Sequence, residues 1–145
     1  MTTPHLLLIL LLAAALPAAA DLAAARAEPN LEKRADLASD NGYEAVERAR
    51  TAYVGGKDEE YKKTIAEIRE SVDLCYKSLD DSGKSARRSP KHFKRAEAKF
   101  DATARKLDAL AQEVSLDDRQ EVVDLKKHVV DLQDKIVEEI MSKQH

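Results

Sequence analysis

The sequence predicts an all-α protein: an antiparallel four-helix bundle of up-down-up-down order that follows an N-terminal signal peptide. Two observations support the bundle. Apolar residues recur at alternating spacings of three and four along four separate segments, the pattern of helices that pack along a narrow seam. The 145-residue chain also has only four Gly and four Pro, too few for the many tight turns of a β-sandwich or barrel. This length fits a single domain.

An apolar stretch near the N-terminus predicts export. Residues 6–16 are Leu, Ile and Ala only, and Pro17 and three alanines follow, as in a secretory signal peptide cleaved after Ala20. The stretch is shorter than the about 20 apolar residues that span a bilayer. The expected location is therefore the periplasm or the cell exterior, with no membrane span after cleavage. Because residues 1–5 lack Lys and Arg, a retained membrane anchor is the alternative. A cut after Ala25 or Ala27 is also possible.

Residues 21–29 are expected to form a flexible lead-in, and residues 30–145 the bundle, with helices at about 30–54, 58–80, 90–114 and 116–142. The seam of the first helix is mostly small, at Leu31, Ala35, Ala38, Gly42, Ala45, Ala49 and Ala52. Small seam residues allow close backbone approach but bury little apolar area. We therefore expect the first helix to be the least stable of the four.

The other three seams carry larger side chains. The second consists of Tyr61, Ile65, Ile68, Val72, Cys75 and Leu79. The third consists of Phe93, Ala96, Phe100, Thr103, Leu107, Leu110 and Val114. The fourth consists of Val122, Leu125, Val129, Leu132, Ile136 and Ile140. These positions are the predicted core.

Glycines and capping residues mark the breaks between helices. The glycines at 55–56 supply a left-handed helix end, and the acids at 58–60 suit the positive start of the next helix. Residues 80–83 end the second helix. The Ser-Pro pair at 89–90 is expected to start the third, with the Ser as cap and the Pro as first helical residue. Residues 115–118 form a capping-box variant, although one long kinked helix is the alternative at this tight junction.

The most distinctive charge feature lies between the second and third helices. This basic segment, residues 84–95, has no acid and contains Lys84, Arg87, Arg88, Lys91, His92, Lys94 and Arg95. Cations at a helix start oppose the helix dipole, so helix stability alone does not explain them. Arg side chains and the free N–H groups of residues 89–91 suit a phosphate or carboxylate, which makes the segment a candidate site for an anion or an acidic partner. A solvated loop balanced by Asp80, Asp81 and other acids is the alternative.

Other chemistry has little support in the sequence. The net charge of −3 gives no global case for nucleic acid. A di-metal bundle needs Glu-x-x-His pairs, which the sequence lacks. Asp124 and His128, with Asp131 beyond them, fit an i,i+4 ion pair better than a surface metal site. Neither a nucleophile elbow nor a Gly-rich phosphate loop occurs. We therefore expect no enzyme activity, no cofactor and no metal.

The single Cys excludes an intramolecular disulfide and a Cys-rich zinc site. Cys75 falls on the second seam between Val72 and Leu79, where a free Cys packs as a small hydrophobic residue. A redox thiol or an intermolecular cross-link is the alternative. The oligomeric state stays open, because seven-residue seams close either within one chain or between chains, as in a coiled coil.

Two resemblances add to these expectations. Residues 49–61 resemble the turn of a tetratricopeptide repeat, with a small residue, a Tyr, a Gly and then acids, but no period of about 34 residues recurs. Almost the whole mature chain, including residues 30–79, 87–95 and 140–143, is similar to a group of uncharacterised small secreted helical proteins of environmental bacteria. That resemblance implies export and an all-helical fold, and it implies no activity.

The sequence therefore predicts an exported structural or interaction protein whose partner is an unidentified protein or an anionic surface. A periplasmic protein that binds an anion or small ligand through residues 84–95 is the alternative. Salt dependence separates electrostatic binding from other contacts, because charge interactions at a protein surface weaken as ionic strength rises.

Overall fold

The computed structural model describes residues 21–142, which form five helices and no strands. The four long helices are α2 (Leu31–Val54), α3 (Asp58–Asp81), α4 (Lys91–Glu113) and α5 (Leu116–Met141). Their ends lie within one residue of the ranges expected from the apolar spacing. The described part of the chain is therefore all-helical. The predicted signal peptide falls on residues 1–20, outside the described residues.

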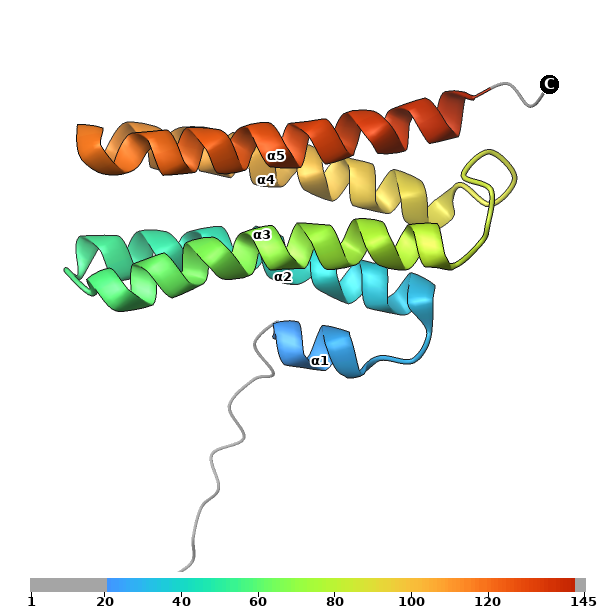
Figure 1. Cartoon of the computed structure of the whole chain (residues 1–145), viewed down its shortest axis with the longest axis horizontal. Helices are drawn as coiled ribbons and strands as arrows, with labels where there is room; N and C mark the ends of the chain where they lie inside the picture. The colour runs from blue at the N-terminus through green and yellow to red at the C-terminus, as the bar shows by residue number, and fades with distance from the viewer. Residues whose placement is uncertain (1–20, 143–145) are drawn as a thin grey trace, which may run out of the picture.

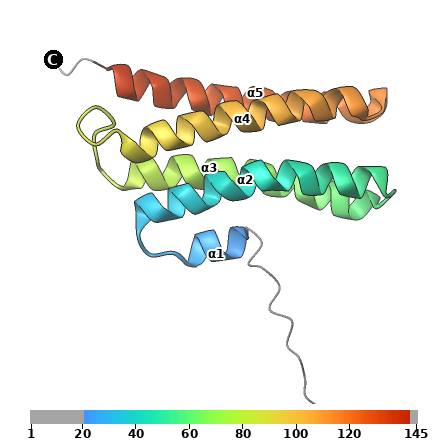
Figure 2. The same ribbon diagram turned by 180° about the vertical axis from the view of Figure 1, so that it is seen from behind.

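The long helices pack as two neighbouring pairs (Figures 1 and 2). α2 lies against α3, α4 lies against α5, and the pairs meet mainly where α2 contacts α4. Connections of three residues (55–57) and two residues (114–115) make each pair a helical hairpin. The result is an arrangement compatible with a helical bundle. Between residues 21 and 142, none of the helices has the length and apolar character needed to cross a membrane.

The predicted seams form the core. Every seam residue of α3 and α4 is buried, and Phe100, Ile68 and Leu79 are among the largest fully buried side chains. The terminal positions Leu31 and Ile140 are partly exposed. Spacings of three and four predict burial well because they place residues on one face of a helix.

The residues expected as a flexible lead-in contain a further helix, α1 (Leu22–Ala27). It folds back along α2 (Figure 1), and Leu22 and Ala25 are buried. Asp21 caps it by accepting a hydrogen bond from the backbone N–H of Ala23 at 2.9 Å. The sequence analysis missed α1 because its six residues are too short to establish an apolar period.

The glycine breaks are confirmed. Gly56 and Gly83 have φ angles of +68° and +66°, the left-handed conformation that favours glycine. Gly56 follows α2 and Gly83 follows α3. The N–H groups of residues 55–57 donate to the carbonyls of residues 51–53, so three of the last four carbonyls of α2 are satisfied.

Two predicted helix starts differ from the structure. α4 begins at Lys91 with Pro90 as its N-cap, and no side chain in the described residues caps it, so Ser89 is not the cap. The Ser115 hydroxyl at the start of α5 donates to the Asp118 carboxylate at 2.9 Å instead of accepting from a backbone N–H. In both cases the predicted boundary is nearly right and the predicted hydrogen bond is wrong, because cap geometry depends on a single rotamer.

α4 and α5 are two helices rather than one kinked helix. Val114 and Ser115 are extended between them, with ψ angles of 161° and 162°. Arg119 Nε donates to the carbonyl of Ala111 at 2.7 Å, and the Tyr53 hydroxyl of α2 accepts the Ser115 N–H at 2.7 Å. The contact with Tyr53 joins this turn to a residue 62 positions away in the chain. Because that contact is long-range, the local sequence did not decide between the two alternatives.

Candidate functional site

The basic segment lies at the end of the bundle where α2 begins and α5 ends (Figures 1 and 2). Its first half lies on the connection between α3 and α4, and its second half forms the first turns of α4. Its Lys and Arg side chains are all exposed; Lys84 and Arg95 contact α2, and the other four are Arg87, Arg88, Lys91 and Lys94. The structure thus places the sequence-predicted residues together at one end of the molecule.

Three acids on α2 face the basic segment. Glu32, Asp36 and Asp40 are spaced four residues apart and therefore share one side of the helix. Their side chains are 19%, 17% and 29% exposed, so they lie against α4 rather than in open solvent. We call these three residues the acidic face of α2.

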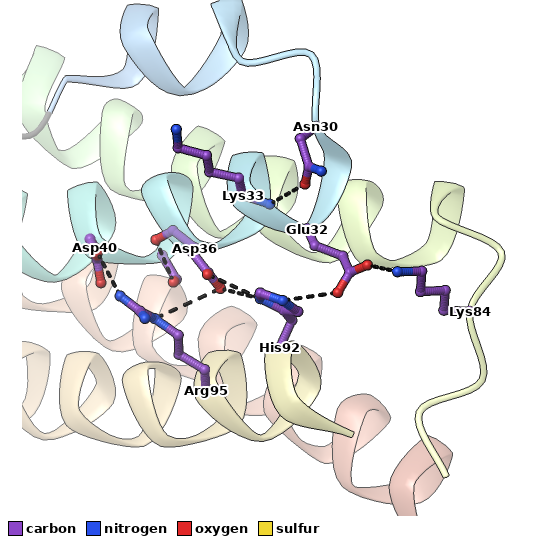
Figure 3. A network of polar contacts seen from close by, with 9 residues as sticks. Asn30, Glu32, Lys33, Asp36, Asp40, Lys84, His92 and Arg95 are labelled. Atoms are coloured by element: carbon purple, nitrogen blue, oxygen red, sulfur yellow. Dashed lines mark hydrogen bonds and ion pairs between the residues drawn. The ribbon is translucent and has the colours of Figure 1, made fainter. Parts of the chain in front are cut away.

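His92 lies between the first two of these acids (Figure 3). Its Nε2 is 2.9 Å from Glu32 Oε2, and its Nδ1 is 3.0 Å from Asp36 Oδ2. Ionised carboxylates only accept hydrogen bonds, so both contacts are hydrogen bonds when both ring nitrogens carry a proton. The His92 ring thus joins two successive turns of α2 to the start of α4.

Lys84 reaches the same acid from the connection. Its ammonium contacts Glu32 Oε1, while His92 binds Oε2 (Figure 3). The hydrogen bond from Lys84 lowers the pKa of Glu32 below its ordinary value; partial burial opposes this shift, and the charges of His92, Lys84 and Lys91 add to it. Glu32 is therefore an ionised carboxylate held by two cations from different elements.

Arg95 and Lys99 continue this pairing along α4. Arg95 Nε is 3.7 Å from Asp36 Oδ1 and its Nη2 is 3.4 Å from Asp40 Oδ2. Lys99 Nζ is 3.3 Å from Asp40 Oδ1 and also lies 4.8 Å from the ring centroid of Tyr43. The acidic face of α2 thus meets a row of cations on α4, which forms an ion-pair ladder between the two helical hairpins.

The structure divides six of the seven predicted site residues into two parts, and the seventh, Arg88, is exposed but not without a partner. Three members pair with the acidic face of α2: Lys84, His92 and Arg95. Three exposed members make no hydrogen bond or ion pair with another residue in the range 21–142: Arg87, Lys91 and Lys94. The acids that pair with the segment are those of α2, which belong to the other acids expected at this end, whereas Asp81 pairs with Lys77 at 2.6 Å. The i,i+4 spacing of acids in the first helix was the signal that the sequence analysis overlooked.

The predicted pairing of His128 is wrong. Its Nε2 lies 2.5 Å from Asp73 Oδ1 on α3, across the bundle, and not beside Asp124. Asp124 accepts from Gln120 at 2.9 Å, and Asp131 pairs with Lys127 at 2.9 Å. In residues 21–142 no group of three His, Cys, Asp or Glu side chains could hold a metal ion.

Cys75 is a core residue. It is fully buried, and burial raises the pKa of its thiol above the ordinary value. A protonated, enclosed thiol is a poor nucleophile and a poor redox group. The seam interpretation of Cys75 is confirmed.

A buried polar network that the sequence pattern did not predict joins α2 and α3. Asn41 is fully buried, and its Nδ2 donates to Ser71 Oγ at 2.9 Å. Arg48 donates to Asn41 Oδ1 at 3.1 Å and pairs with Glu67 at 2.6 Å. Asn41 follows the acidic face directly in sequence, so its polarity alone gave no sign of burial. Both polar atoms of the buried Asn41 amide have partners within the network, which favours a structural role for Asn41 over a binding role.

Comparisons with known proteins found no matching family model, curated protein or solved structure. The candidate site therefore rests on the geometry of this structure and not on similarity to a known protein. That geometry is a ladder of paired acids and bases, with the exposed cations of the basic segment at one end of a helical fold.

Proposed function

We propose that the protein is an exported helical-bundle interaction module that binds anionic groups of a partner through the basic segment. The proposal includes export to the periplasm or cell exterior by a signal peptide cleaved after Ala20. It also includes an up-down-up-down order of α2 to α5, which the two short connections support.

The division of the basic segment carries the proposal. Lys84 anchors the connection to α2, and His92 anchors the start of α4. The exposed cations Arg87, Arg88, Lys91 and Lys94 lie on and just after this anchored stretch. An ordered group of cations loses less conformational entropy on binding than a flexible one, and it complements an anionic surface electrostatically.

An interaction role fits the side chains better than catalysis does. Cys75 is enclosed in the core, and His92 and His128 are both held by carboxylates from other helices. The exposed groups of the site are cations, which recognise anions without further chemistry.

A small-anion binding protein is the second candidate. Lys84 and His92 already converge on one carboxylate, so this pair has the geometry of an anion site. In the folded chain Glu32 supplies that anion.

The test is binding of poly-L-glutamate to the protein purified from the exported fraction. Its mass, measured by native mass spectrometry, is expected to equal that of a chain starting at Asp21. Affinity is expected to fall with ionic strength, because the contacts are exposed charges. Alanine at Arg87, Arg88, Lys91 and Lys94 together is expected to weaken binding by at least about tenfold, equivalent to about 1.4 kcal/mol.

The matched control removes four exposed cations elsewhere, at Lys57, Lys62, Lys63 and Arg69. This variant has the same net charge as the site variant and is expected to bind nearly as well as the wild type. Equal losses in both variants would mean that net charge alone drives binding, and the proposed site would be wrong. An intact Met1 in the exported product would contradict the signal peptide.

A further inference from the structure

Two side chains of the basic segment, Lys84 and His92, converge on a single carboxylate. The Lys84 ammonium contacts Glu32 Oε1, and His92 Nε2 lies 2.9 Å from Glu32 Oε2 (Figure 3). Lys84 comes from the connection, His92 from α4 and Glu32 from α2. Three elements therefore meet at one carboxylate, and each of its oxygens contacts a nitrogen of a different side chain.

This position can be reached from solvent. The side chain of Lys84 is 53% exposed and that of Glu32 is 19% exposed. Lys91, one residue before His92, is exposed. An external carboxylate that approaches the exposed cations thus arrives beside the pair of donors that now hold Glu32.

We propose that Glu32 is an internal ligand of this site, and that an acidic side chain of a partner protein replaces it on binding. The inference rests on the proposed function, and it specifies the chemistry of the partner as a carboxylate. The internal contact is autoinhibitory, because the site binds an external carboxylate only in the fraction of molecules from which Glu32 has moved away.

Exchange at Glu32 leaves the rest of the ladder in place. Asn30 caps α2 by accepting the Lys33 N–H at 2.9 Å, so the helix start does not depend on Glu32. Asp36 stays bound to His92 and Arg95 after Glu32 leaves. The partner carboxylate then forms the same charge-assisted contacts that Glu32 gives up, so the exchange replaces like with like.

The test compares Glu32→Ala with the matched variant Glu44→Ala. Glu44 is an exposed acid on the same helix and has no hydrogen bond or ion pair within residues 21–142, so its removal changes the net charge equally. A short oligoglutamate peptide is titrated into each protein, and the imidazole resonances of His92 are followed by NMR. If Glu32 occupies the site about nine-tenths of the time, Glu32→Ala binds the peptide about tenfold more tightly than the wild type.

Two further variants locate the gain in affinity. Adding Lys84→Ala to Glu32→Ala is expected to remove the gain, because one of the two converging donors is lost. Glu32→Gln removes the charge but keeps the size of the side chain, so a smaller gain is expected. If circular dichroism shows that Glu32→Ala has lost helical structure, the peptide affinity of Glu32→Gln is compared with that of the wild type instead.

The outcomes separate this inference from the proposed function. Equal peptide affinity in Glu32→Ala and Glu44→Ala overturns the internal-ligand assignment, even when the wild type binds poly-L-glutamate through the exposed cations. An equal gain for inorganic phosphate overturns the carboxylate assignment and makes the site a general oxyanion site. If the variant that lacks Arg87, Arg88, Lys91 and Lys94 binds as well as the wild type, the proposed function itself is wrong.

Discussion

α2 packs against its two main neighbours in different ways. On the α3 side, a Cβ atom added at Gly42 would lie 3.3 Å from Ser71 Cβ and 3.5 Å from Val72 Cγ1, so the two backbones approach closely. On the α4 side, the acidic face of α2 meets the cations of the ladder. The first interface depends on side-chain volume and the second on charge, so each responds to a different perturbation.

The α2–α3 interface also buries polar groups fully, whereas the charged groups of the α2–α4 interface are partly exposed to solvent. Asn41 is fully buried with its amide satisfied by Ser71 and Arg48. Arg95 of the ladder has a side chain that is 51% exposed. Buried hydrogen bonds fix one register of two helices, while half-exposed ion pairs are screened by salt.

The largest expected effect breaks the close interface. Gly42→Leu is expected to lower the free energy of unfolding by about 3 kcal/mol, because the new side chain meets α3 in a packed core. Chemical denaturation measures the change. Ala66→Leu on the exposed side of α3 is the control and is expected to change stability by less than about 0.5 kcal/mol. A Gly42→Leu protein as stable as this control would mean that α2 and α3 are not closely packed in solution.

A smaller effect is expected at the charged interface. Asp36→Asn weakens the contacts to His92 and Arg95 and is expected to destabilise the protein by about 1 kcal/mol at low salt. The matched change Asp131→Asn removes an exposed i,i+4 pair with Lys127 and is expected to cost less than about 0.5 kcal/mol. At high salt, the loss of stability caused by Asp36→Asn should be smaller than at low salt. The loss caused by Gly42→Leu should be the same at both salt concentrations. A salt-independent Asp36→Asn effect would contradict a charge-based interface.

The smallest expected effect is the pH dependence from Glu32. The pKa of Glu32 is lowered in the folded protein, so folding stabilises its ionised form. The resulting contribution to the free energy of unfolding is fully present above the pKa that Glu32 has in the unfolded chain. The contribution is lost as pH falls through the lowered pKa. The wild type should therefore be more stable than Glu32→Gln at neutral pH, and the difference should shrink in acid. Denaturation of both proteins across that range tests this, and a constant difference would show that Glu32 acts through shape rather than charge.

The sequence by itself determined the four long helices and most of the core, but not the short helix α1. Spacings of three and four identify a buried face because they depend on helix geometry alone, and they correctly selected residues such as Ile68, Cys75 and Phe100. The helix ends at Gly56 and Gly83 were also predictable, since a left-handed residue is a local backbone property. Signals of this kind need no knowledge of distant parts of the chain.

The tertiary structure decided which charges are paired. The sequence identified Lys84 and His92 as candidate site residues, but their shared partner Glu32 lies 52 residues before Lys84. His128 likewise pairs with Asp73, 55 residues away, instead of with its helical neighbour. Long charged side chains have several partners within reach, and the packing of helices selects among them. Composition therefore located the basic segment, and only the fold divided it into an anchored part and an exposed part.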